Sequence, residues 1–239
     1  MTSRLQAVKP AITGSRPPPL LRVSGGCRIF CSVRSFRPRA LAGVVAPVFA
    51  SVALTALSIA RHRFLNDVGW SAVHRTRVEW PSLLELGDIG WLTIALFILV
   101  GVCGVALATA IWQSADVPVE RVVAVLIALM SVAIALEGFR PDLPSPEPLN
   151  SWHNTLHNAV FPAIPATSLL AASSLAYAAR RVRRPYLDAV ANNTLLTLMG
   201  LGLVLTAFGS IAQLARYLYF GALLVWIELL ALGVLRRET

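Results

Sequence analysis

Long, uninterrupted apolar runs alternate with short polar segments along most of the chain. Residues 40–60 and 89–112 contain no charged residue at all. A helix rises 1.5 Å per residue, so about 20 apolar residues cross the roughly 30 Å hydrocarbon layer of a bilayer. Backbone groups in lipid must find hydrogen bonds within their own segment, and the alternating pattern of a barrel strand is missing. The pattern therefore predicts transmembrane α-helices.

The sequence predicts an all-α, polytopic transmembrane bundle with six spans, which together form one domain over residues 40–237. The third span has the shortest apolar stretch, which ends at Glu137. A tight hairpin at Arg216 and Tyr217 separates the last two spans. Pro162 and Pro165 predict a kink where the fourth span begins. The predicted spans are residues 40–60, 89–112, 122–139, 157–179, 194–215 and 217–235.

The N-terminal segment, residues 1–39, differs from the rest in composition. It carries eight Lys or Arg and no acidic residue, which predicts a disordered basic tail. A transit peptide, a signal peptide cleaved after Ala60 and a wrongly assigned start codon are alternatives that the sequence leaves open. The following apolar stretch of about 20 residues is longer than a signal peptide needs, which favours a retained anchor.

The overall composition agrees with a membrane protein. Hydrophobic residues make up 56% of the chain and charged residues 14%, too few to cover a water-soluble globule of this size. The formal net charge of +9 invites a nucleic-acid partner, but the basic residues stand at the ends of the apolar runs. There they serve as orientation signals, so we expect membrane lipids and no nucleic acid as partners. The composition does not indicate the oligomeric state.

The distribution of Lys and Arg predicts the orientation. With both termini in the cytoplasm, fifteen of these residues lie inside and six outside, and the balance is seven to six without the tail. The loop with Arg180, Arg181, Arg183 and Arg184 then decides the direction. We therefore expect a multi-pass protein of the cell membrane with cytoplasmic N- and C-termini. This orientation places all four histidines on the outer side.

His153 and His157 are the first candidate site. They are four residues apart at the start of the fourth span, so a helix places both imidazoles on one face, as metal ligands require. Asp142 is the candidate third ligand of a zinc site, and Glu137, His74 or Asp88 could add a general base. No Glu stands between the two histidines, so the His-Glu-x-x-His motif is absent. Interfacial histidines that bond loop carbonyls or water are the alternative interpretation.

Glu228 is the second candidate, because it falls near the middle of the sixth predicted span. An ionised carboxylate costs at least a few kcal/mol there and usually faces a partner inside the bundle. The functional interpretation is an intramembrane polar contact for a proton, an ion, a lipid headgroup or a substrate. The structural interpretation is a protonated Glu that bonds across helices.

The sequence lacks the common catalytic motifs. It contains no phosphate-binding glycine loop and no Gly-x-Ser-x-Gly elbow. We therefore favour a non-enzymatic membrane protein that binds or moves a small solute, an ion or a lipid, without a cofactor. The alternative from another class is a zinc-dependent hydrolase at the outer leaflet that uses His153, His157 and Asp142.

Several segments carry a family resemblance. They are Trp80-Pro-Ser-Leu-Leu-Glu-Leu-Gly-Asp-Ile-Gly-Trp-Leu92 before the second span, Glu137-Gly-Phe-Arg-Pro-Asp142 after the third, the His157 entry to the fourth, and Gln213-Leu-Ala-Arg216. Over residues 41–235 the chain resembles the bacterial membrane family catalogued as domain of unknown function 998. The resemblance implies about six helices in a bacterial cytoplasmic membrane. It implies no activity.

Overall fold

All regular secondary structure in the described residues is helical, as the sequence predicts. The computed structural model describes residues 36–70, 81–142, 151–179, 185–208 and 211–238. Nearly all of the predicted tail lies outside these residues. The elements are α1 (Arg37–Ala60), α2 (His62–Asp67), the 3-10 helix η1 (Ser82–Glu85), α3 (Gly90–Ser114), α4 (Pro118–Leu136), α5 (Trp152–Val160), α6 (Ala163–Ala179), α7 (Ala189–Leu205) and α8 (Ala212–Glu238).

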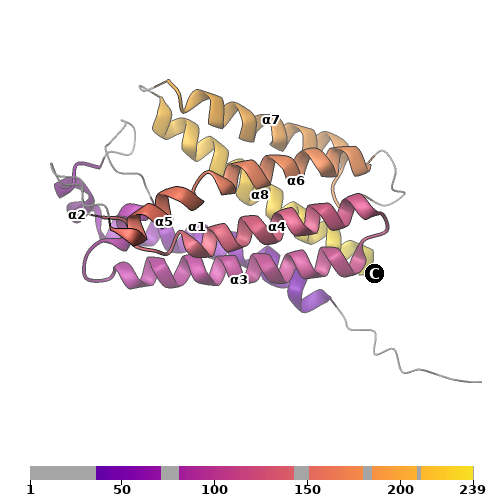
Figure 1. Cartoon of the computed structure of the whole chain (residues 1–239), viewed down its shortest axis with the longest axis horizontal. Helices are drawn as coiled ribbons and strands as arrows, with labels where there is room; N and C mark the ends of the chain where they lie inside the picture. Colours follow the sequence, from indigo (N-terminus) through magenta and orange to yellow (C-terminus); the bar gives the residue numbers. More distant parts are fainter. Residues whose placement is uncertain (1–35, 71–80, 143–150, 180–184, 209–210, 239) are drawn as a thin grey trace, which may run out of the picture. The chain divides into compact units, whose positions relative to one another are not determined.

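The six long helices contact one another in a closed circuit. α1 packs against α3, α3 against α4, α4 against α6, α6 against α7, α7 against α8, and α8 back against α1. Figure 1 shows α5 leading into α6 and α8 crossing the other helices obliquely. The short elements α5 and η1 lie at one end of the circuit, which we call the α5 end, since they contact α4 and the start of α3.

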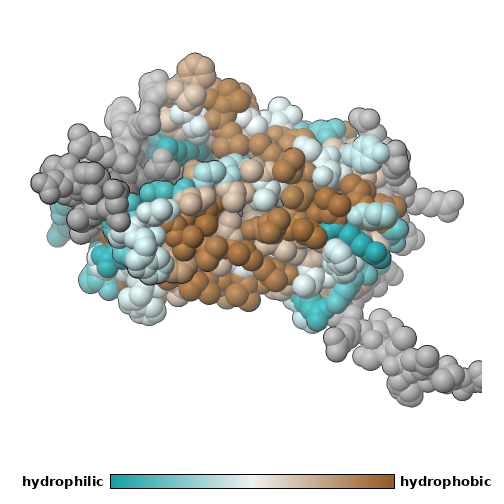
Figure 2. All heavy atoms as spheres, viewed as in Figure 1, coloured by the Kyte–Doolittle hydropathy of each residue, from teal (hydrophilic) through white to brown (hydrophobic). Residues whose placement is uncertain are grey.

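The surface of these helices is suited to lipid. Five helices among the described residues are long and apolar enough to span a membrane, and α7 is a shorter apolar helix. Figure 2 shows an apolar middle between polar ends. Trp91 and Trp112 are 63% and 50% exposed at the two ends of α3, and the 21 residue steps from one to the other correspond to about 31 Å of helix. That spacing matches the two aromatic belts of a bilayer.

Two predicted boundaries are wrong. The last hairpin lies between Leu205 and Ala212, and Arg216 and Tyr217 belong to α8. Arg216 is only about one turn inside α8, so its long side chain reaches polar surroundings without ending the helix. The start of α7 was also placed too late, because the Asp188 carboxylate caps it by accepting hydrogen bonds from the Val190 and Ala191 N–H groups.

The structure also shows where the helix of the third span begins and where the helix of the fourth span is interrupted. α4 does not need the residues after Glu137, because it begins at Pro118, four residues before the predicted start. The kink in the fourth span is confirmed, since α5 ends at Val160 and α6 begins at Ala163. Pro162 lies in the interruption and lacks the N–H that would continue the helix.

Glycines allow close contact at the helix crossings. A Cβ atom on Gly104 of α3 would clash with the Ser131 Oγ of α4, and one on Gly43 of α1 would lie 2.9 Å from a Leu107 side-chain carbon. On α7, a Cβ atom on Gly202 would lie 2.8 Å from the Tyr219 backbone N of α8. Small residues are common where membrane helices pack closely, because burial from water does not drive their association.

Two glycines on α7 provide a matched test of this packing. Replacing Gly202→Ala should destabilise the protein by about 1–3 kcal/mol, because the backbone of α8 must move to admit the methyl group. Gly200→Ala meets no atom within 4 Å and should be neutral or stabilising by up to about 1 kcal/mol. Thermal unfolding in detergent compares the two. Equal effects would show that the α7–α8 crossing is not this close.

Candidate functional site

The most buried ionisable groups at the α5 end come from three separate elements. Glu137 follows α4, His157 belongs to α5, and Glu85 ends η1. All three side chains are buried. We call these three residues the acid–histidine cluster. Tertiary folding assembles it, since 72 residues separate the first member from the last.

The contacts of His157 require a proton between its ring and Glu137. The Nδ1 atom lies 2.9 Å from the Glu137 and Phe139 carbonyl oxygens, which accept hydrogen bonds but cannot donate them. Nδ1 therefore carries a hydrogen. The Nε2 atom lies 3.3 Å from Glu137 Oε2, so this contact also needs a hydrogen, on either atom. The pair thus holds one exchangeable proton, as imidazolium with carboxylate or as imidazole with carboxylic acid.

Glu85 is the third acidic group of the site and is 1% exposed. Neither carboxyl oxygen forms a hydrogen bond in the described part of the chain. Burial and, to a smaller extent, the neighbouring Glu137 carboxyl group raise the pKa of Glu85 from 4.5 to about 9, against a lowering by Arg140. Glu85 is therefore a neutral acid at pH 7, because a buried carboxylate without donors is costly.

A second polar group lies beside this cluster and caps α5. The Ser151 hydroxyl donates to Asp142 Oδ1 at 2.6 Å, and the Ser151 oxygen accepts a hydrogen bond from the Asn154 N–H. His153 Nδ1 lies 2.9 Å from Ser151 Oγ and 2.7 Å from the Arg140 carbonyl oxygen. The hydrogen bond from the Ser151 side chain holds the pKa of Asp142 below its usual value. Ser151 is no nucleophile here, because its proton points to Asp142 and the facing His153 nitrogen is itself a donor.

The structure brings two of the three predicted zinc ligands together. Asp142 Oδ1 lies 3.8 Å from His153 Nδ1, whereas His157 pairs with Glu137. Within the described ranges, no three His, Cys, Asp or Glu side chains form a group that could hold a metal ion. His74 lies outside these ranges. The zinc site therefore stays a prediction without geometric support.

Glu228 lies on α8, away from the acid–histidine cluster. It is half-buried, and none of the residues described here forms a hydrogen bond or ion pair with it. Ala231, one turn further along α8, packs on Gly43, so Glu228 lies along the α1 side of α8. It precedes Arg237 by nine residues, or about 13 Å of helix. Its predicted role as an intramembrane contact stays a prediction.

The opposite end of the circuit is closed by a buried ion pair. Arg237 near the end of α8 contacts both carboxylate oxygens of Glu120 in the first turn of α4, at 2.6 and 3.2 Å. The Arg237 guanidinium also lies 3.6 Å from the centre of the Tyr186 ring and donates to the Ser114 carbonyl oxygen. The Tyr186 hydroxyl contacts Ser114 Oγ at 2.9 Å. This cluster joins α3, α4, α8 and the segment before α7.

Sequence reasoning overlooked several of these residues. Glu85 stands alone among leucines in Leu83-Leu84-Glu85-Leu86, and an isolated acid in an apolar segment was a signal for a buried carboxyl group. The sequence also does not single out Glu120 and Arg237 as a pair. Their pairing has no local signal, because 117 residues separate them.

Breaking the second cluster should destabilise the protein. Arg237→Gln leaves the Glu120 carboxylate buried without its cation, so we expect a loss of about 3–5 kcal/mol. The double variant with Glu120→Gln should recover part of it, because no unpaired charge remains. Exposed Arg236→Gln, the control, should cost no more than about 1 kcal/mol. Thermal unfolding in detergent measures all four proteins, and a double variant less stable than Arg237→Gln would contradict the pairing.

Glu85 should make stability depend on pH. The folded protein keeps this proton up to about pH 9, whereas the unfolded chain releases it near pH 4.5. The Glu85 contribution to the free energy of unfolding should therefore fall as the pH rises from about 4.5 to 9 and then level off. Glu85→Gln keeps a neutral side chain and should lack this decline. Melting temperatures of both proteins across this range test it, and parallel curves would show that Glu85 is ionised in the folded state.

The comparisons with known proteins assign the family but no activity. The family described as "Protein of unknown function (DUF998)" matches residues 76–235, which include the acid–histidine cluster and Glu120 and end two residues before Arg237. No curated protein and no solved structure matches the chain. The match covers well over half of the sequence and agrees with the resemblance noted in its loops. The chain is thus a multi-pass membrane protein that belongs to the DUF998 family.

Proposed function

We propose that this protein binds a small ion, the proton, at the acid–histidine cluster and moves it across the membrane. The observation that supports the proposal is the buried 3.3 Å contact between His157 Nε2 and Glu137 Oε2, which one exchangeable proton must bridge. An imidazole paired with a carboxyl group can hold, release and reload a proton near neutral pH.

The arrangement of the cluster supports exchange of the shared proton rather than its permanent retention. Each of the three side chains comes from a different element, so a small shift of α5 against α4 changes the distance between His157 and Glu137. Separating them removes the stabilisation of the shared proton, which then leaves for water, because the neutral Glu85 already carries its own proton. Intramembrane acids and histidines commonly form such relays in pumps and transporters.

The cluster is also close to the water at one end of the helices. Glu137 directly follows the last residue of α4, and the exposed Asp88 carboxylate lies 3.1 Å from Arg61 at the same end. With the N- and C-termini in the cytoplasm, which the arginine distribution favours, this end faces the outside of the cell membrane. The cluster would then load protons from the external medium.

Purified protein in proteoliposomes with an internal pH-sensitive dye tests the proposal. An imposed proton gradient should dissipate through the wild-type protein. Glu137→Gln should slow this flux at least about tenfold, because it removes one of the two groups that bind the shared proton. His157→Gln should act in the same direction. Both variants must first show wild-type melting behaviour within a few degrees, so that a folding defect is not read as lost flux.

Glu228→Gln is the matched control, since it changes an acid of the same type on a distant helix. It should keep the wild-type flux. Loss of flux in Glu228→Gln alone would move the site to α8, and wild-type flux in Glu137→Gln would end the proposal.

A further inference from the structure

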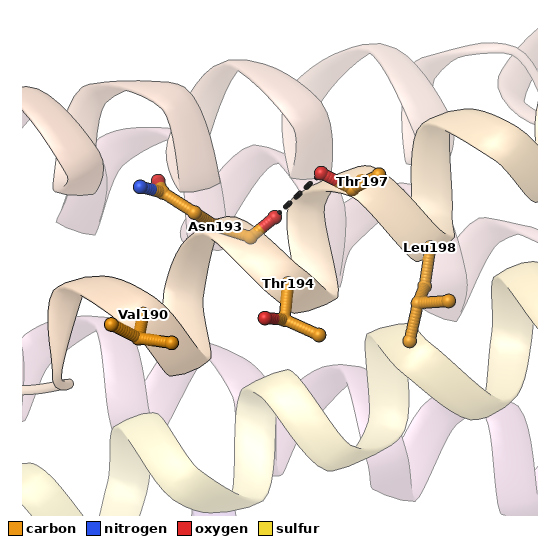
Figure 3. A pocket seen from close by; sticks show the side chains of 5 residues that line it. All are labelled: Val190, Asn193, Thr194, Thr197 and Leu198. Atoms are coloured by element: carbon orange, nitrogen blue, oxygen red, sulfur yellow. Dashed lines mark hydrogen bonds between the residues drawn. The ribbon is translucent and has the colours of Figure 1, made fainter.

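The outward face of α7 carries an open hollow of about 430 Å³ that the proposed proton site does not use. Its lining consists of Val190, Asn193, Thr194, Thr197 and Leu198, as Figure 3 shows. All five residues belong to α7, and Val190 is 73% exposed, so the hollow opens away from the neighbouring helices. In a membrane this face meets lipid.

Polar groups in the hollow still need hydrogen-bond partners. The Thr197 hydroxyl is satisfied, because it donates to the Asn193 carbonyl oxygen at 2.8 Å. The Asn193 amide and the Thr194 hydroxyl are exposed and form no hydrogen bond with the described residues. On the outward face of α3, by contrast, the exposed Thr109 hydroxyl donates to the Ala106 carbonyl oxygen. The Asn193 amide and the Thr194 hydroxyl thus remain available as donors to the surroundings, whereas the Thr109 hydroxyl does not.

The order of these groups along α7 matches the order of groups in a phospholipid. Asn193 and Thr194 lie about 6–8 Å along the helix from the first residue of α7, next to its polar end. Further along, the exposed side chains are the apolar Leu201 and Val204. A headgroup beside Asn193 would therefore place its acyl chains along these two residues.

The sequence before α7 favours a phosphate-bearing lipid over a neutral one. Arg180, Arg181, Arg183 and Arg184 precede the helix within nine residues of its start. They lie outside the described residues and are not part of the site. Such a local excess of positive charge attracts lipid phosphates. α7 has 17 residues, or about 25 Å of helix, which is shorter than the roughly 30 Å hydrocarbon layer. A bound lipid can accommodate this difference by thinning the bilayer locally.

We propose that the hollow on α7 binds one diacyl glycerophospholipid, whose phosphate and ester oxygens accept hydrogen bonds from the Asn193 amide and the Thr194 hydroxyl. The lipid covers the open hollow on α7, which with α6 is one of the two shortest of the six long helices at 17 residues each. This site is separate from the acid–histidine cluster, and neither proposal depends on the other.

Native mass spectrometry of the delipidated protein in detergent tests the site with two probes, a phosphatidylglycerol and the diacylglycerol with the same chains. The wild-type protein should retain one phosphatidylglycerol and bind diacylglycerol at least about tenfold more weakly. Asn193→Leu with Thr194→Val removes two hydrogen-bond donors and should weaken phosphatidylglycerol binding about tenfold. Thr109→Val on α3 is the control and should bind as the wild type does.

Three outcomes would overturn the proposal. The first is wild-type phosphatidylglycerol binding by the α7 double variant, and the second is equal binding of the two probes. The third is a change from dimer to monomer in the α7 variant with lipid binding unaltered, which would make this face a contact between copies of the chain. Melting temperatures without added lipid show whether the variants fold, and a lipid-induced rise confined to wild type and Thr109→Val would support the site independently.

Discussion

The hydrogen-bond requirement of groups in a low-dielectric environment governs this structure more than any other constraint. Lipid offers no partners, so the backbone becomes helical and most buried side-chain polar groups pair within the protein. The ends of α4 show the result. Glu120 at one end meets Arg237, and Glu137 at the other meets His157. Because α4 also packs between α3 and α6, these two contacts tie both of its ends to other helices.

The two pairs differ in what protons can do. Arginine keeps its charge at any accessible pH, so the Glu120–Arg237 pair is a permanent ionic contact, and burial raises the pKa of the adjacent Tyr186 to about 12, which keeps its phenol neutral. The His157 pair can exist in two protonation forms and stands beside Glu85, whose pKa is about 9. The circuit is therefore held firmly at one end and has titratable groups at the other. This asymmetry is the physical basis for placing proton movement at the α5 end.

The other candidate polar groups differ in whether they form hydrogen bonds within the protein. In the Asp142–Ser151–His153 group, Ser151 caps α5 and donates to Asp142, and His153 Nδ1 contacts the Arg140 carbonyl oxygen. Asn192 on α7 is likewise engaged, since its amide donates to the Ala172 carbonyl oxygen and accepts from Trp226 Nε1. Its neighbour Asn193 points outward without such partners. Adjacent residues are about 100° apart around a helix, so Asn192 faces its partners inside the protein and Asn193 faces the surroundings.

The sequence by itself determined that this protein lies in a membrane, that it is helical and approximately where its spans lie. The lengths of the apolar runs and the positions of the charges are local properties of the chain. It also indicated the break at Pro162, a property of one residue. It misplaced the hairpin before α8, because an arginine near a helix end tolerates either environment. Only the tertiary structure decided which ionisable groups come together. Glu137 pairs with His157, and burial together with Glu137 raises the pKa of Glu85, although these residues belong to elements far apart in the sequence. Glu228 and the His153–His157 spacing are prominent in the sequence but do not converge on a common site among the described residues. Local patterns predict where a helix forms and which residues it contains. Which of its polar groups form pairs depends on the rotation and register of neighbouring helices, which no single segment encodes.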